Sequence, residues 1–196
     1  MKNCSTLPEG YRPILSLDLQ KNKRQMLIVN LIGTVIAIVM LAVALPFVPF
    51  STLFDMSAGL GMYALRFGVL LVGMIAYIVL HELVHGILMR ALSGVKPRYG
   101  FTLMYAYAGS DAYFNKGSYL LIALAPVVIW GIVLGTIGLL VPSEWFWVVY
   151  LIQMVNLSGA GGDLYVTFKF ARLPRDILVR DTGVAMTVFA PSETKE

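Results

Sequence analysis

The chain has 196 residues, of which 58% are hydrophobic and only 13% are charged, and its net charge is +4. Soluble domains usually carry about 25% charged residues, so this composition excludes an ordinary soluble domain. One cysteine, Cys4, excludes a disulfide-stapled fold, and the chain has no low-complexity tract that would indicate disorder. We therefore expect an integral membrane protein.

Four apolar stretches are long enough to cross a bilayer as helices, which takes about 20 residues each. They are residues 26–45, 67–89, 119–141 and 145–168. Such continuous apolar runs favour helices over the alternating pattern of a membrane β-barrel. We predict an all-α integral membrane fold in which residues 1–196 form a single membrane domain, with a basic arm at 1–25 and a tail at 169–196.

The basic residues predict an orientation. The arm, the 90–118 loop and the tail together hold 14 of the 15 Lys and Arg residues, whereas the 46–66 loop holds only Arg66. Because Lys and Arg gather on the cytoplasmic side, we predict a multi-pass protein of the cell membrane with both termini in the cytoplasm. This signal explains the positive charge without a nucleic-acid partner.

Within the 90–118 loop, aromatic and apolar side chains recur at every second position from Tyr99 to Tyr107. This period of two predicts a short β-strand or hairpin. An extended substrate could add to such a strand through backbone hydrogen bonds, which makes Tyr99 and Phe101 candidate substrate-binding residues. An aromatic strap at the membrane interface explains the pattern equally well.

The second apolar stretch contains the motif His81-Glu82-Leu83-Val84-His85. On a helix, positions i and i+4 lie on one face, so the two imidazoles can hold one Zn²⁺ at about 2.0–2.1 Å. Glu82 beside them can act as a general base toward water. His81 and His85 are the only histidines of the chain. Ionisable groups in a membrane helix are costly and usually functional, although a structural polar cluster is the alternative.

A catalytic zinc site uses three protein ligands, and Asp163 is the only other acid within a predicted span. His85 precedes Arg90 by five residues, and Asp163 precedes Lys169 by six. At about 1.5 Å per residue, both therefore lie one to two turns from the inner surface. We predict that Asp163 is the third ligand.

The segment from Asn156 to Asp163 contains three glycines and one serine, which weaken a helix. Close packing of helices through small residues explains this composition. A broken or tightly packed segment that brings Asp163 to the metal explains it as well, and Asn156 could then offer its amide to a substrate backbone. We also predict that Pro126 kinks its helix.

Three aspartates lie in the 90–118 loop and the tail, and we expect them to be solvated surface charges. They are Asp111, Asp176 and Asp181.

The chain resembles the site-2 protease class of intramembrane metalloproteases and, more closely, a bacterial family of membrane zincin peptidases of unassigned function. The resemblance covers roughly residues 60–185. It is carried by His81-Glu82-Leu83-Val84-His85-Gly86, the Tyr99-Gly100-Phe101 strand, Ala125-Pro126, and Asn156 through Asp163.

The resemblance implies that His81, His85 and Asp163 bind zinc and that Glu82 is the catalytic acid and base. It also implies that Asn156 helps to hold the substrate or the oxyanion. The site-2 segment usually reads N-x-x-P-x-x-x-x-D-G. Here Gly159 replaces the proline, the acid follows Asn156 by seven residues rather than eight, and Leu164 replaces the final glycine.

These observations predict a zinc-dependent intramembrane metalloprotease that cleaves a membrane protein or peptide near the cytoplasmic face of the lipid bilayer. The alternatives are another hydrolase and a non-catalytic protein, namely a metal-binding protein, a transporter or a degenerate zincin. A transporter would carry ionisable groups along several spans, whereas here they gather at one depth. A degenerate zincin would be expected to lack Glu82, which is present.

Overall fold

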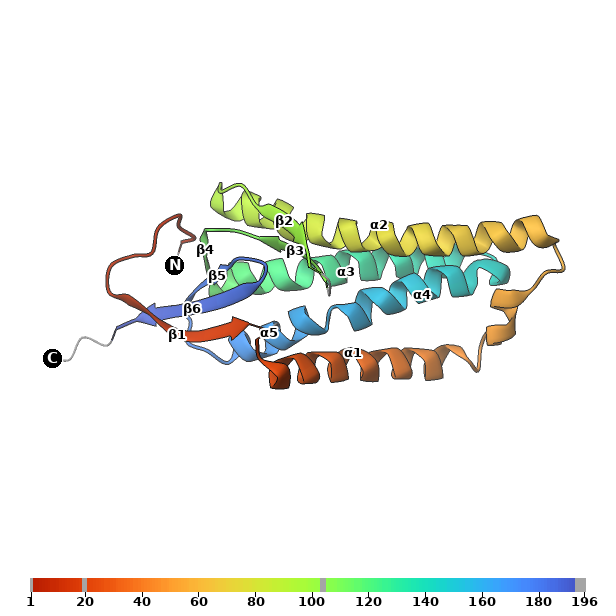
Figure 1. Ribbon diagram of the computed structural model, residues 1–196, viewed down its shortest axis with the longest axis horizontal. Coiled ribbons are helices and arrows are strands. Elements are labelled where there is room, and N and C mark those ends of the chain that lie inside the picture. Colours follow the sequence, from red (N-terminus) through yellow and green to blue (C-terminus); the bar gives the residue numbers. More distant parts are fainter. Residues whose placement is uncertain (1, 19–20, 103–104, 193–196) are drawn as a thin grey trace. The chain divides into compact units, whose positions relative to one another are not determined.

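The computed structural model describes residues 2–18, 21–102 and 105–192 (Figure 1). The helices in these residues are α1 (Lys23–Ala44), α2 (Leu60–Ser93), α3 (Lys116–Leu140), α4 (Ser143–Gly159) and α5 (Gly161–Ala171), with a short 3₁₀ helix, η1 (Phe50–Phe54). The strands are β1 (Tyr11–Asp18), β2 (Arg98–Phe101), β3 (Ala106–Gly109), β4 (Tyr113–Asn115), β5 (Leu178–Asp181) and β6 (Ala185–Pro191).

Among the described residues, three helices are long and apolar enough to cross a membrane: α1, α2 and α3. Many of their large apolar side chains have no protein cover; Leu31, Ile38 and Leu71 are 59%, 61% and 62% exposed. Such surfaces are typical of helices that face lipid. The chain therefore has the character of a membrane protein.

The predicted fourth span, 145–168, is not one helix. Helix α4 has 17 residues and ends at Gly159, and α5 has 11 residues and begins at Gly161. Neither α4 nor α5 is among the helices that are long and apolar enough to cross a membrane. The total of four spans stays a prediction.

The prediction of an all-α fold is wrong for the arm and the tail. Strands β1, β6, β5 and β4 form an antiparallel sheet in that order, within the described residues. Strand β1 comes from the predicted arm, and β5 and β6 come from the predicted tail, where Tyr11 pairs with Pro191. Pairing between such distant segments leaves no local periodic signal, which is why the sequence pattern missed it. Residues 193–196 of the tail lie outside the described residues.

The hairpin predicted in the 90–118 loop is present as β2 and β3, with Phe101 opposite Ala106. Beyond the last strand pair, Thr102 and Tyr105 are joined by backbone and side-chain hydrogen bonds. The predicted pattern ran from Tyr99 to Tyr107, and its members Leu103 and Met104 lie outside the described residues.

The three acids predicted to be solvated differ in their surroundings. Asp111 is exposed and pairs with Arg98 and Arg180 at 2.7 and 2.6 Å, and the hydrogen bond from Arg180 lowers the pKa of the Asp111 carboxyl. Asp176 is also exposed.

For Asp181 the prediction is wrong, because this residue is only 6% exposed. The Tyr119 hydroxyl donates to its Oδ2 at 2.6 Å, and the backbone N–H of Gly183 donates to its Oδ1 at 2.8 Å. Burial raises the pKa of the Asp181 carboxyl. Strand pairing buried this acid, and its sequence neighbours gave no sign of that.

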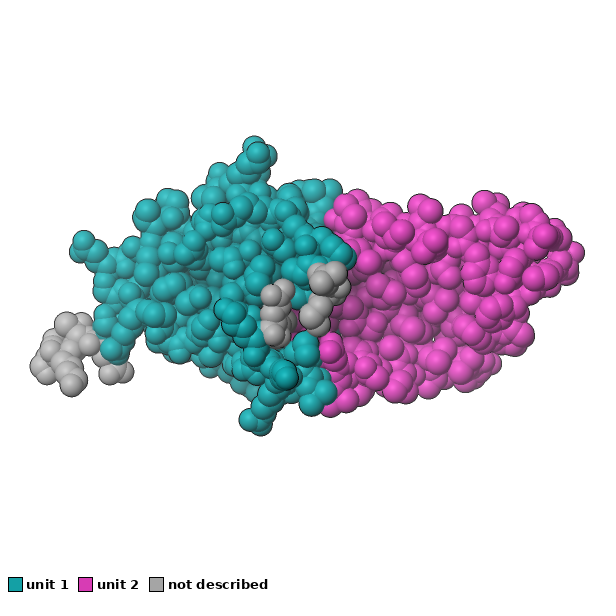
Figure 2. Space-filling model, viewed as in Figure 1, with its two compact units in different colours: residues 1–28, 82–126, 163–196 teal, residues 29–81, 127–162 magenta. Residues whose placement is uncertain are grey.

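The chain divides into two compact units (Figure 2). The first comprises residues 1–28, 82–126 and 163–196, and the second comprises 29–81 and 127–162. In the first unit, apolar side chains of the four-stranded sheet and of helices α2, α3 and α5 pack around buried Phe114 and Phe170. In the second, the core gathers around Trp147 and Val148 of α4. The single membrane domain stays a prediction.

In the second unit, small residues let α1 approach the junction of α4 and α5. A Cβ atom on Gly33 would lie 2.5 Å from the carbonyl oxygen of Ser158, and one on Gly161 would lie 2.7 Å from that of Val29. Both distances are shorter than a carbon–oxygen contact allows. The glycine-rich segment therefore packs tightly, as one of the two interpretations of its sequence requires.

We predict that Gly33→Ala lowers the thermal unfolding midpoint in detergent, because the new methyl group collides with backbone. Overpacking of this kind costs about 1–3 kcal/mol. Gly135→Ala in α3 is the matched control, since a Cβ there meets nothing within 4 Å. Equal midpoints for the two variants would contradict the packing described here.

Candidate metal centre

His81 and His85 lie one turn apart on α2, and each is 8% exposed. The border between the two compact units falls after His81, but α2 continues through it from Leu60 to Ser93 without a break. The position of one imidazole relative to the other is therefore set by the local geometry of a single helix. Glu82, the next residue along α2, is half-buried.

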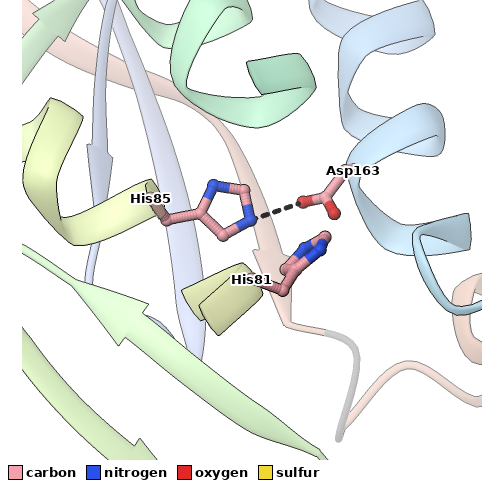
Figure 3. Close-up of side chains that lie close together, drawn as sticks. All are labelled: His81, His85 and Asp163. Atoms are coloured by element: carbon pink, nitrogen blue, oxygen red, sulfur yellow. Dashed lines mark ion pairs between the residues drawn. The ribbon is translucent and has the colours of Figure 1, made fainter. Parts of the chain in front are cut away.

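Asp163 is in the first turn of α5, directly after the break that ends α4 at Gly159. Its Oδ1 lies 3.5 Å from Nε2 of His85. Among the described residues, His81, His85 and Asp163 each offer one ligand atom, and these atoms lie within 4.8 Å of one another. Figure 3 shows the Asp163 carboxylate beside both rings.

These three residues fit a zinc ion by their chemistry and their spacing. Two imidazoles and one carboxylate are a common ligand set of catalytic zinc. Ligand atoms held at about 2.1 Å by a tetrahedral ion are about 3.4 Å from one another. The 3.5 Å distance between Nε2 of His85 and Oδ1 of Asp163 agrees with that value.

The ring of His85 is oriented by α3. Its Nδ1 lies 2.9 Å from the carbonyl oxygen of Ile122. A helical carbonyl usually accepts from the N–H four residues later, but that residue is Pro126, which has no N–H. The proline thus leaves the Ile122 carbonyl available to His85. Since a carbonyl only accepts, Nδ1 carries the proton, and in the neutral ring Nε2 then keeps the lone pair that a metal needs.

The ring of His81 is oriented by a side chain. Its Nδ1 lies 2.7 Å from Oη of Tyr77, and Tyr77 donates its hydroxyl proton to Oδ1 of Asn156 at 3.0 Å. The amide nitrogen of Asn156 lies 3.2 Å from both the Val127 carbonyl oxygen and Oε1 of Gln153. Asn156 is completely buried, and Tyr77 is 6% exposed.

The structure thus groups His81, His85 and Asp163. The other predicted site residues, Asn156, Tyr99 and Phe101, are not part of this group of ligand atoms. Both ends of the Asn156 amide are bonded to protein atoms, so in this conformation the amide is not offered to a ligand. Tyr99 and Phe101 lie on β2 and are 49% and 75% exposed. The roles of all these residues stay predictions.

The Tyr99 ring also packs against the motif helix. A Cβ atom on Gly86 would overlap the hydroxyl and ring atoms of Tyr99. The glycine that follows His85 therefore makes room for the hairpin. Because of this contact, β2 lies directly against the turn of α2 that carries His85.

Sequence reasoning missed Tyr77 and the carbonyl of Ile122. The sequence spacing could have indicated both groups, since Tyr77 precedes His81 by four residues and Ile122 precedes Pro126 by four. A tyrosine one turn from a histidine can reach it, and a helical proline exposes the carbonyl one turn earlier.

Comparison with known proteins assigns the chain to a protein family. A family model described as "putative zincin peptidase" matches residues 74–178, which is more than half of the chain. The matched range includes the motif of α2, the β2–β3 hairpin, Asn156 and Asp163. No curated protein and no solved structure gives a significant match.

We predict that Gly86→Ala lowers the unfolding midpoint in detergent, because the methyl group displaces the Tyr99 ring at a cost of about 1–3 kcal/mol. In a Tyr99→Ala background the same substitution should be nearly neutral, since the ring is gone. Thermal unfolding of the two single variants and the double variant measures this coupling. Additive effects would show that the two residues do not share this contact.

Proposed function

Because the chain belongs to the putative zincin peptidase family, we propose that it is a zinc-dependent intramembrane peptidase. The observation that carries the proposal is the group formed by His81, His85 and Asp163, with Glu82 next to it on α2. The likeness of its motifs to those of site-2 proteases supports the same activity. The substrate is a membrane protein or an apolar peptide.

In this proposal His81 and His85 hold zinc through Nε2, and Asp163 holds it through a carboxylate oxygen. When bound, zinc supplies a Lewis acid that polarises both water and the scissile carbonyl group. Glu82 takes the proton from the attacking water and then gives it to the leaving amine. The buried partners of the two rings keep the ligand geometry fixed during these proton transfers.

The depth of cleavage follows from the basic residues. Arg90 lies five residues after His85, and Lys169 lies six residues after Asp163. If both basic side chains are cytoplasmic, as the charge distribution predicts, the reacting peptide bond lies near the cytoplasmic face. The termini are then cytoplasmic as well, and the protein belongs to the cell membrane.

The β2 strand is the element that we propose to receive the substrate. It pairs with β3 along one edge in the two-stranded sheet, and its Tyr99 and Phe101 side chains are exposed. A peptide extended along the other edge would form backbone hydrogen bonds with β2. This pairing would keep the peptide from forming a helix, so that its peptide bonds stay accessible. The Tyr99–Gly86 contact supports this role, because it keeps β2 beside the motif helix.

We predict about one zinc per chain in detergent-purified protein and a large loss of zinc in Asp163→Ala, which removes one of three ligands. Asp111→Ala is the matched control, because Asp111 is an exposed acid paired with arginines. Metal analysis of purified protein after equilibration with zinc measures the content. A wild-type chain without zinc would contradict the peptidase proposal and favour a structural polar cluster.

We predict that Glu82→Gln abolishes peptide cleavage but keeps zinc, because the amide cannot accept a proton and Glu82 is not a ligand. A loss of about 100-fold or more in rate is expected for a general base. The assay uses fluorescently labelled peptides with one apolar segment, reconstituted with the protein in liposomes.

Glu144→Gln, at the start of α4, is the control for this substitution and should keep full activity. Equal cleavage by the wild type and Glu82→Gln would refute the proposed role of Glu82. Zinc binding without cleavage of any labelled peptide by the wild type would favour a non-catalytic metal-binding protein.

A further inference from the structure

The hydroxyl of Tyr77 lies between a proposed zinc ligand and a buried amide. Its Oη is 2.7 Å from Nδ1 of His81 and 3.0 Å from Oδ1 of Asn156. A phenol has one proton, so it can donate to only one of these two atoms. Which atom receives the proton decides the tautomer of His81.

The orientation of Asn156 settles that choice. Its Nδ2 lies 3.2 Å from the carbonyl oxygen of Val127 and 3.2 Å from Oε1 of Gln153. The Gln153 amide is itself oriented, because its Nε2 donates to the Gly131 carbonyl oxygen. Turning the Asn156 amide over would set oxygen against two acceptors in a buried site, which is costly. The Asn156 oxygen therefore faces Tyr77.

The hydroxyl proton of Tyr77 then goes to Asn156, and its oxygen accepts the N–H of Nδ1 of His81. We infer that Tyr77 and Asn156 are positioning residues, which hold His81 as the Nδ1–H tautomer and so leave Nε2 to bind the metal. The inference rests on the zinc site of the proposed function. It assigns to Asn156 a role in orienting a ligand, in place of contact with the substrate.

His85 reaches the same tautomer by a different means. Its Nδ1 faces the backbone carbonyl of Ile122, an acceptor that no side-chain substitution at position 122 removes. The two rings thus share one protonation pattern, but only that of His81 depends on side chains. Because the chain has two histidines, His85 serves as an internal reference for His81.

The test is nitrogen NMR of the full-length chain without a histidine tag, labelled with ¹⁵N-histidine, in detergent, free of metal and at a pH where both rings are neutral. We expect both rings to be in the Nδ1–H form in the wild type. Tyr77→Phe removes the acceptor while keeping the aromatic ring. It should shift the His81 population toward Nε2–H and leave His85 unchanged.

Asn156→Leu tests the second step. Without Oδ1, the Tyr77 hydroxyl is able to donate its proton to Nδ1 of His81 instead. The His81 ring should then shift to Nε2–H although Tyr77 is still present. A merely structural role of Asn156 would not change the tautomer of the His81 ring.

Zinc affinity gives the second readout, measured by competition with a chromophoric chelator. Loss of a partner that orients a ligand typically weakens metal binding about 10–100-fold, and we expect this for Tyr77→Phe. Tyr150→Phe is the matched control, since its hydroxyl donates to the Met40 carbonyl oxygen in the same unit. The double variant Tyr77→Phe/Asn156→Leu should be no weaker than Tyr77→Phe, because both act through one chain of bonds.

Two results would overturn the inference: an Nε2–H form of His81 in the wild type, or a Tyr77→Phe variant whose His81 tautomer and zinc affinity match those of Tyr150→Phe. The wild-type spectrum needs no substitution, so a variant that fails to fold does not decide the matter. A wild type that shows the Nδ1–H form but binds no zinc supports the orientation of His81 and refutes the zinc function alone.

Discussion

The burial of two imidazole rings in an apolar helix is the constraint on which the rest of the site depends. Each ring has two nitrogens, and only one of them can bind a metal, so the other needs a partner. Where no water is at hand, that partner must be protein. The chain provides one acceptor from the backbone, the Ile122 carbonyl that Pro126 leaves without its helical donor, and one from a side chain, the Tyr77 hydroxyl. The helical Pro126 and the buried Tyr77 thus each contribute to orienting one of the two imidazole rings.

The glycine-rich segment before Asp163 has two structural consequences. Its small residues let α1 come close enough that a methyl group at Gly33 or Gly161 would collide with backbone. It also ends α4 at Gly159, so that Asp163 falls in the first turn of α5. The first turn of a helix stabilises a negative charge, because the free backbone N–H groups of that turn point toward the charge. The segment is therefore both closely packed and broken.

The sequence predicted the apolar helices α1, α2 and α3 well, because length and composition are local properties. It predicted the hairpin for the same reason. It missed the sheet, since β1 and β6 come from opposite ends of the chain and their pairing has no local signature. The error at Asp181 has the same origin, because that acid is buried by its strand neighbours and by Tyr119.

Local spacing was enough to predict the pairing of His81 with His85, because a separation of four residues on a helix places two side chains on one face. The sequence also named Asp163, the one other acid in an apolar stretch. The folded chain was needed to show which oxygen lies beside His85, which groups orient the two rings, and that Asn156 is enclosed among protein partners. Helical periodicity acts over a few residues, whereas these contacts depend on how segments distant in the chain pack together.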